Sequence, residues 1–360
     1  MRHDVQRPPL LPCLTKPLRL ARQPTYRRQM ATFSGTEANE TWQGDNGNIS
    51  HTLDGGGGLN TLDYSSLLGF IKTTASAPAP GLFSSPGWTV SKSIGLGVDT
   101  AVNFSRIIGT AGNDTFTGIT AGTYAYRSTA IRGGSGNDTY YGNGYTQNAV
   151  DYTTLGGPVV VDLAAGTAFK GAYGIDTLHS VRNVRASAFN DTLLGSADTD
   201  FFAVGLAGEH HIDGRGGVDR YTFTGTTNIV VDLALGQAQK SSGVVDYLVS
   251  IEQAAGGSGN DTLLGNEGNN FLFGLEGNNY LDGREGEDWA SFRTFWNTLQ
   301  TTGGTIDLRF GTATNPWGGT DTLVSIEHAA GGWYNDTLTG LIRADGSPSY
   351  LRGGPGIGPG

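Results

Sequence analysis

The sequence is poor in the residues that build a disulfide framework, a large globular core or a membrane span. Its 360 residues include a single cysteine, Cys13, which excludes an intramolecular disulfide. Charged residues make up 16% of the chain, below the roughly one quarter usual for soluble domains. No stretch approaches the roughly 20 apolar residues of a membrane-spanning helix, and no long segment shows helical apolar periodicity. These shortages favour a thin core built from short strands.

The signatures of several enzyme classes are also absent from the sequence. It has no H-E-x-x-H zinc motif and no G-x-S-x-G nucleophile elbow, which excludes the common metalloprotease and lipase patterns. Its glycine-rich stretches are not followed by helical patterns, so they do not predict a nucleotide-binding loop. The pair His210 and His211, followed by Asp213, matches no zinc spacing, and we expect it in a solvent-facing turn. We therefore expect a protein that is not an enzyme.

The net charge of −10 is distributed unevenly along the chain. Residues 1–29 carry a net charge of +6, which leaves −16 for the remaining 331 residues. Prolines interrupt every short apolar run of this basic segment, so we expect a tail that is disordered or not translated, with the protein proper beginning near Met30. The acidic body argues against nucleic-acid binding, and its self-repulsion predicts folding that depends on cations.

Glycine is abundant, with 58 residues, and the segment 256–291 arranges it in four unbroken nonapeptides. These are GGSGNDTLL, GNEGNNFLF, GLEGNNYLD and GREGEDWAS, so positions 1 and 4 are always Gly, position 6 is Asp or Asn, and position 8 is Leu or Ala. The residues at positions 1, 4 and 6 are Gly256, Gly259 and Asp261; Gly265, Gly268 and Asn270; Gly274, Gly277 and Asn279; and Gly283, Gly286 and Asp288.

This spacing predicts a chain that reverses direction every nine residues. Glycines permit tight turns, and the central residue of each extended triplet would point inward, so that two nonapeptides make one coil of a parallel β-roll. Position 6 would then lie beside position 6 two repeats later, which pairs Asp261 with Asn279. The same rule pairs Asn270 with Asp288. One carboxylate and one amide per pair predict weak sites for a hard cation such as Ca²⁺; alternatively, these side chains only cap their own turns.

The same nine-residue frame recurs elsewhere with less regular glycines. GTAGNDTFT at 109–117 and GGSGNDTYY at 133–141 keep both glycines, whereas His210 takes position 6 in GLAGEHHID at 205–213. Phe189 and Tyr334 replace the position-4 glycine in two further copies, which weakens the case for cation sites there. The additional candidate metal ligands are Gly109, Gly112, Asp114, Gly133, Gly136, Asp138, Asp191, Asp200, Asp219 and Asp336.

A longer unit recurs around these turns, with a V-D-L strand, then D-x-L, then N-D-T-L. The strand aspartates are Asp162, Asp232 and Asp307; the D-x-L aspartates Asp176, Asp246 and Asp321 follow each by 14 residues, and the N-D-T-L aspartates by a further 15. A shorter first copy has Asp99 placed 15 residues before Asp114. Equal spacing within copies indicates internal duplication of β-solenoid rungs. We expect degenerate repeats over 30–98 and β-roll and solenoid repeats over 99–360, and we leave open a truncation at the C-terminus.

The Gly, Asp and Leu positions of residues 256–291 resemble the G-G-x-G-x-D-x-U-x nonapeptide of the RTX, or hemolysin-type, calcium-binding family. The resemblance implies an all-β fold, a parallel β-roll or β-solenoid, with Ca²⁺ as its cofactor and the glycines and position-6 residues named above around the metal. It also implies export by a type I secretion system and folding on calcium outside the cell.

Two other functions stay open at this point. One is a polysaccharide-acting solenoid enzyme, or its non-catalytic module, similar to RTX-bearing alginate epimerases; the other is a module that adheres to cell surfaces. An enzyme of the first kind needs clustered carboxylates in a groove. Asp162, Asp232 and Asp307 occupy equivalent places in three copies, which favours repeat structure over a single active site.

Overall fold

The computed structural model describes residues 31–36, 38–44, 50–55, 60–76, 87–93, 98–102, 104, 106–117, 129–142, 148–293, 302–343 and 346–354. The basic segment 1–29 lies outside these residues. The described chain forms a 21-stranded sheet and a 13-stranded sheet, which we call sheet A and sheet B, and a 3-10 helix, η1 (Gly171–Tyr173). No helix in this part of the chain is long and apolar enough to cross a membrane.

The strands are short, and the chain alternates between the two sheets. Sheet A contains β1 (Ala31–Ser34), β3 (His51–Asp54), β5 (Ile71–Ser76), β6 (Gly87–Lys92), β7 (Val98–Val102), β9 (Thr115–Thr117), β11 (Thr139–Tyr141), β13 (Val160–Asp162), β14 (Thr167–Phe169), β15 (Ile175–His179), β17 (Thr192–Leu194), β19 (His211–Asp213), β21 (Ile229–Asp232), β22 (Gln237–Lys240), β23 (Val245–Val249), β25 (Thr262–Leu264), β27 (Tyr280–Asp282), β29 (Thr305–Asp307), β30 (Thr312–Thr314), β31 (Thr320–Val324) and β33 (Thr337–Thr339). Sheet B contains β2 (Thr41–Gln43), β4 (Thr61–Asp63), β8 (Arg106–Ile108), β10 (Thr129–Arg132), β12 (Asn148–Asp151), β16 (Asn183–Arg185), β18 (Phe201–Val204), β20 (Arg220–Phe223), β24 (Gln253–Ala255), β26 (Phe271–Phe273), β28 (Trp289–Ser291), β32 (His328–Ala330) and β34 (Leu351–Arg352).

The nonapeptides of residues 256–291 fold as their spacing predicts. Each gives one three-residue strand, and successive strands fall alternately in sheet A and sheet B. The side chains at position 8, Leu263, Leu272, Leu281 and Ala290, are all buried in the core between the sheets. Strands two repeats apart pair in parallel, with Leu263 beside Leu281 and Leu272 beside Ala290. The predicted parallel β-roll is confirmed.

The nonapeptides and the longer units form one continuous solenoid. The V-D-L strand β21 pairs in parallel with the nonapeptide strand β25, and β27 pairs in parallel with the D-x-L strand β31. Both sheets therefore run through the two kinds of repeat, and the all-β solenoid fold is confirmed. Sheet A also crosses residue 98, because β3 pairs with β7 and β5 with β9; the division of the chain at that residue stays a prediction.

The longer units differ from the simple rungs that the sequence suggested. Each adds three strands to sheet A, and the middle strand is antiparallel to both of its neighbours. The four triplets are β5–β6–β7, β13–β14–β15, β21–β22–β23 and β29–β30–β31.

A glycine four residues after the V-D-L aspartate allows the chain to reverse into the middle strand. Gly166, Gly236 and Gly311 have φ values of 70°, 63° and 61°, in the left-handed region that favours glycine. The alanine two residues later, such as Ala238, points into the core. A middle strand such as QAQK offers one small apolar residue, so its sequence does not stand out as a strand.

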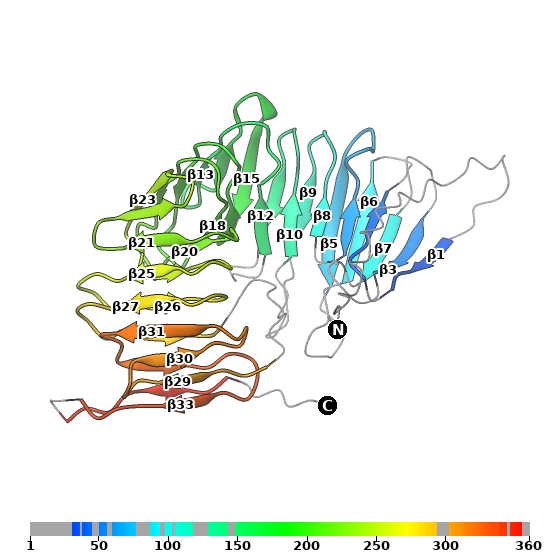
Figure 1. Ribbon diagram of the computed structural model, residues 1–360. Helices are drawn as coiled ribbons and strands as arrows, with labels where there is room; N and C mark the ends of the chain where they lie inside the picture. Colours follow the sequence, from blue (N-terminus) through cyan, green and yellow to red (C-terminus); the bar gives the residue numbers. More distant parts are fainter. Residues whose placement is uncertain are drawn as a thin grey trace, which may run out of the picture.

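The stacked coils follow an arc, with the first and last coils at its two ends (Figure 1). Strands of sheet A such as β13, β15 and β23 lie on its outer side, and strands of sheet B such as β12, β18 and β20 lie on its inner side (Figure 1). The turns that join the two sheets therefore line up along two edges of the stack.

Replacement of a position-4 glycine should destabilise the stack through contact between coils. Gly286 has a φ of 121°, and a β-carbon on it would lie 2.6 Å from the carbonyl oxygen of Gly268 in the neighbouring coil. Gly243 also has a positive φ, 85°, but a β-carbon there meets nothing within 4 Å. We expect Gly243→Ala to lower the free energy of unfolding by about 1 kcal/mol, and Gly286→Ala by at least about 2 kcal/mol, because the second change adds a collision to the backbone strain. Urea unfolding of both variants measures the difference, and equal losses would contradict it.

Candidate calcium sites

The position-6 side chains lie along two edges of the solenoid. We call the edge where the chain passes from sheet A to sheet B the acidic edge; its turns include 195–200, 214–219, 250–252, 265–270, 283–288 and 325–327. We call the opposite edge, where the chain passes from sheet B to sheet A, the lysine edge; its turns include 109–114, 133–138, 186–191, 205–210, 256–261, 274–279 and 331–336.

Neighbouring coils are tied together by hydrogen bonds between position-6 residues. The backbone N–H of Asp261 donates to Oδ1 of Asn279 at 2.9 Å. On the other edge, the backbone N–H of Asn270 donates to Oδ1 of Asp288 at 2.7 Å. These two pairs are the ones that the sequence predicted. In each, one side-chain oxygen is already used to hold the adjacent coil.

The predicted residues of the lysine edge have their oxygen atoms largely occupied. These residues are Asp114, Asp138, Asp191, Asp261, Asn279 and Asp336. Oδ2 of Asp261 accepts the N–H of Gly257 in its own turn at 2.8 Å, while Oδ1 accepts the N–H of Ile229 at 3.0 Å. Asp191 likewise accepts from the N–H groups of Ser187 and Val159. On this edge the turn-capping role that the sequence left open is present.

His210 occupies position 6 on the lysine edge, but the expectation of a solvent-facing turn was wrong. Its side chain is fully buried, and its backbone N–H donates to Oδ1 of Asp246 at 2.9 Å, as the backbone N–H of an aspartate does in other turns. The adjacent His211 is exposed and stacks on Tyr247. The buried ring is therefore a substitute within the ladder, and the two histidines do not converge on one site.

The acidic edge contains four of the predicted residues and two that the sequence analysis missed. Asp200, Asp219, Asn270 and Asp288 lie there as position-6 residues, and Glu252 and Glu327 extend the ladder. The backbone N–H of Asp219 donates to Oε2 of Glu252 at 2.9 Å, and that of Asp288 to Oε2 of Glu327 at 2.9 Å. A signal for these glutamates was available, because S-I-E follows D-x-L after one intervening valine at 250–252 and again at 325–327.

Buried carboxylate oxygens without a hydrogen-bond donor set the acidic edge apart. Oδ1 of Asp200, Oδ2 of Asp219 and Oδ2 of Asp288 are buried and accept no hydrogen bond from any described residue, although Nη1 of Arg182 lies 3.9 Å from Oδ1 of Asp200. In the turns of Asp219 and Asp288, an arginine occupies position 2. The backbone N–H of Arg215 donates to Asp213, at the end of the preceding strand, instead of to the position-6 residue. The backbone N–H of Arg284 donates to Asp282 in the same way. Because buried polar atoms without partners are costly, these oxygens call for a cation or another donor.

Burial also changes the protonation of these carboxyls. Desolvation raises the pKa of Asp219 to about 7, with further contributions from the charges of Asp200 and Glu252. Desolvation likewise raises the pKa of Asp288 to about 7, assisted by Glu327 and Glu287. The pKa of Asp200 is raised for the same main reason. Desolvation, with repulsion from neighbouring carboxylates added to it, thus favours protonation at this edge, and a bound cation would favour the charged form instead.

The donor set at the acidic edge consists of oxygen atoms. A β-carbon on Gly214 would collide with both Oδ2 of Asp219 and the carbonyl oxygen of Ser250, so these two oxygens converge above the glycine. Gly283 brings Oδ2 of Asp288 and the carbonyl oxygen of Ser325 together in the same way. No three His, Cys, Asp or Glu side chains gather as metal ligands within the described ranges. Carboxylates mixed with turn carbonyls suit a hard cation such as Ca²⁺.

The aspartates of the V-D-L strands have partners of a different kind. Arg215 makes two hydrogen bonds to Asp162, at 2.8 and 2.9 Å, and Arg284 makes two to Asp232, at 2.8 and 2.7 Å. Asp307 receives two from the nearby Arg309. These bidentate pairs neutralise the strand aspartates and join turns to strands more than fifty residues away in sequence in the first two cases.

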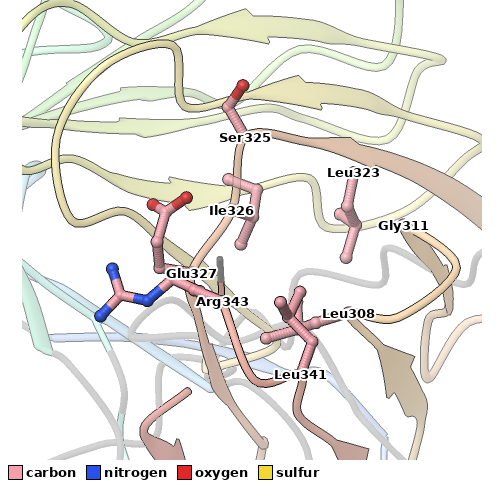
Figure 2. A pocket seen from close by; sticks show the side chains of 8 residues that line it. All are labelled: Leu308, Gly311, Leu323, Ser325, Ile326, Glu327, Leu341 and Arg343. Carbon is pink, nitrogen blue, oxygen red and sulfur yellow. The ribbon is translucent and has the colours of Figure 1, made fainter. Parts of the chain in front are cut away.

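A pocket of about 180 Å³ opens beside Glu327, near the C-terminal end of the stack. Figure 2 shows Glu327 and Arg343 on one side of it, with the aliphatic side chains of Leu308, Leu323 and Leu341 on the other. Arg343 is paired with Glu287 at 2.6 Å, and Glu327 accepts the N–H of Asp288. The charged groups of the pocket therefore belong to the ladder of the acidic edge.

Comparison with known protein families agrees with this geometry. The model of the RTX calcium-binding nonapeptide repeat matches the chain in four copies, at residues 105–118, 131–144, 183–208 and 255–290. The chain carries RTX calcium-binding nonapeptide repeats. Calcium is therefore the cofactor of the RTX repeats in this protein, and the β-roll over 256–291 is the most regular part of them. No curated protein matches the chain.

The raised carboxyl pKa values predict how the calcium-free protein responds to pH. A carboxyl whose folded pKa exceeds its unfolded value stabilises the fold below the unfolded pKa, and this contribution is lost as the pH rises through the folded pKa. For Asp219 and Asp288 the window runs from about 4 to about 7. In calcium-free buffer the free energy of unfolding should fall between pH 5 and pH 8.

Urea unfolding at pH 5, 6, 7 and 8 in resin-treated buffer checks this trend. Asp219→Asn combined with Asp288→Asn should reduce the slope, because the amides do not titrate; burial raises the pKa of Asp138 to about 7 and the pKa values of Asp114, Asp261 and Asp321 to about 6, and these carboxyls retain the rest of the dependence. Stability of the calcium-free wild type that rises over the same range would contradict the assignment.

Proposed function

We propose that calcium binds along the acidic edge and that this binding folds and stabilises the solenoid. Two groups of residues would hold it, Asp200 with Asp219 and Glu252, and Asn270 with Asp288 and Glu327, together with turn carbonyls. The observation that carries the proposal is the set of buried carboxylate oxygens on this edge that accept no hydrogen bond from the described residues. A cation shared between adjacent turns would satisfy these oxygens and remove their repulsion.

The glycines at positions 1 and 4 would contribute to the same sites by allowing the backbones to approach. Gly283 and Gly286 lie where a β-carbon would strike atoms of the neighbouring coil, so only glycine leaves the turn carbonyls accessible. The predicted ligands of the lysine edge stay predictions, and their more complete hydrogen bonding supports a smaller share of the calcium for that edge.

We infer that the protein works outside the cell as a non-catalytic module. In the low-calcium cytosol, the repulsion between buried carboxylates would hold the repeats unfolded, in a form that a type I exporter can pass; millimolar calcium outside would then fold them. Proteins with RTX repeats are typically secreted, which supports this location. The bidentate arginine pairs of Asp162 and Asp232 support a structural role for the residues that an enzyme of the polysaccharide class would need free.

The test is a calcium titration of the full chain, followed by far-UV circular dichroism and thermal unfolding, with magnesium as the ionic control. Calcium should increase the β-sheet signal and raise Tm at micromolar to millimolar concentration, and magnesium should not. Asp219→Asn with Asp288→Asn should raise the calcium midpoint at least about tenfold, since each change removes one charged ligand.

Asp307→Asn is the matched control for the charge change. It removes one carboxylate from the same solenoid, but this aspartate is paired with Arg309 and lies on a strand. Its calcium midpoint should equal that of the wild type. A wild-type chain that is fully folded in chelator and indifferent to calcium would overturn the proposed function.

A further inference from the structure

Three lysine side chains are completely buried on the lysine edge, one at the end of each of the first three antiparallel triplets. Lys92, Lys170 and Lys240 follow or end the middle strands β6, β14 and β22, and none of the three ammonium side chains is exposed to solvent. Lys170 and Lys240 pair with the D-x-L aspartate of their own unit, and Lys92 pairs with Asp99, which holds the equivalent place in the first unit. The distances are 3.3 Å from Lys92 to Asp99, 2.6 Å from Lys170 to Asp176 and 2.9 Å from Lys240 to Asp246.

The ammonium groups also contact the nonapeptide turn of the preceding coil. Nζ of Lys170 lies 2.8 Å from the carbonyl oxygen of Gly134 and 3.0 Å from Oδ2 of Asp138, in addition to Asp176. Nζ of Lys240 lies 2.8 Å from the carbonyl oxygen of Gly208. Lys170 and Lys240 thus each have a turn carbonyl and one or two carboxylates around them, the same kinds of ligand that a calcium ion takes from adjacent turns, while Lys92 has the carboxylate of Asp99.

Each aspartate that pairs with one of these lysines also accepts a hydrogen bond from a buried tyrosine hydroxyl. The hydroxyl of Tyr64 donates to Asp99 at 2.7 Å and that of Tyr152 to Asp176 at 3.0 Å. In the third unit, Tyr221 donates to Asp246 at 2.8 Å. Together with a backbone N–H from the previous coil, each aspartate receives three donors, which leaves it little capacity to bind a metal ion.

The reason for a lysine at these places lies in the topology. At each triplet, the D-x-L strand pairs with the sheet-A strand of the preceding coil, as β15 does with β11. The lysine edge therefore has no second nonapeptide turn beside that coil to complete an oxygen cage. The carboxylate of the last turn, Asp138 in the second unit, is left facing Asp176. A charge tethered to the protein can neutralise this pair without a complete cage.

We propose that Lys92, Lys170 and Lys240 are built-in cations that take the place of calcium where an antiparallel triplet interrupts the stack, so that these three levels of the lysine edge stay closed to the metal. This proposal rests on the proposed function and refines it. Turns that bind calcium would depend on the metal for folding, whereas turns that contact a buried lysine would fold without it.

The fourth unit provides an internal comparison. Asn315 stands where the lysines stand: its Nδ2 lies 2.8 Å from the carbonyl oxygen of Gly277 and 3.2 Å from Oδ1 of Asp321. The contacts are the same in kind, but the amide carries no charge. Asp321 is therefore the D-x-L aspartate that lacks a lysine, and its level should respond to a cation.

Lys170→Ala removes the ammonium from the level with two carboxylates, Asp138 and Asp176. We expect the variant to bind one more calcium ion per chain than the wild type, measured by equilibrium dialysis of the full chain. Its Tm should fall in calcium-free buffer and recover in millimolar calcium. Lys72→Ala, which changes an exposed lysine of β5, is the control and should match the wild type in both measurements.

Asn315→Lys is the reciprocal variant and carries the test if Lys170→Ala does not fold. It should raise the Tm in calcium-free buffer and reduce the further gain that calcium gives, because the new ammonium neutralises Asp321. Equal calcium content in Lys170→Ala and the wild type, or a lower calcium-free Tm in Asn315→Lys, would overturn the proposal. Failure of the proposed function would appear differently, as a wild-type chain that binds no calcium.

Discussion

Each coil of this solenoid depends on a turn amide that finds its acceptor in the side chain of the next coil. The N–H of a position-6 residue donates to the position-6 oxygen of its neighbour, on the lysine edge from Asp261 to Asn279 and on the acidic edge from Asn270 to Asp288. Backbone amides at this depth require an acceptor, and a side chain of the next coil supplies it. In the two pairs above, the acceptor is an Asp or Asn oxygen, whereas Asp219 and Asp288 donate to the glutamates Glu252 and Glu327, and the N–H of Asp191 faces Nδ1 of His210 at 3.4 Å. The constraint therefore tolerates loss of charge but not loss of an acceptor.

The different chemistry of the two edges follows from what happens to the second oxygen. On the lysine edge, the turn of Asp261 directs its own N–H group to that oxygen, and lysines neutralise the charge where triplets enter the stack. On the acidic edge, the backbone N–H groups of the position-2 arginines donate to Asp213 and Asp282 at the ends of the preceding strands. The second carboxylate oxygen of Asp219 and of Asp288 therefore accepts no hydrogen bond from the described residues. In these two turns, the direction of the position-2 backbone N–H leaves the second carboxylate oxygen of position 6 without a donor from its own turn.

The regular part of the fold could be predicted from the sequence because the nine-residue sequence repeat corresponds to one structural repeat. Nine residues make one turn and one strand, so the pairing of Leu263 with Leu281 follows from counting. The antiparallel strands could not be found in this way, because a segment such as QAQK has no apolar run and its partners are set by tertiary contacts. The sequence analysis missed Glu252 and Lys240 for a related reason, because each acts through a contact more than thirty residues away in sequence. A glutamate and a lysine nevertheless recur at these offsets from the D-x-L aspartate, at Glu327 and at Lys170.

The four antiparallel triplets have a mechanical consequence. Each places three strands in sheet A where a simple coil places one, an excess of two strands with no addition to sheet B, which is why the sheets contain 21 and 13 strands. At about 4.8 Å per strand, the difference makes sheet A longer by about 40 Å. Two faces of unequal length cannot stack straight, so the triplets act as wedges in an arch, with sheet A on the convex side (Figure 1). The number of such insertions, rather than the composition of the nonapeptides, therefore sets the curvature of the molecule and the width of the concave face lined by sheet B.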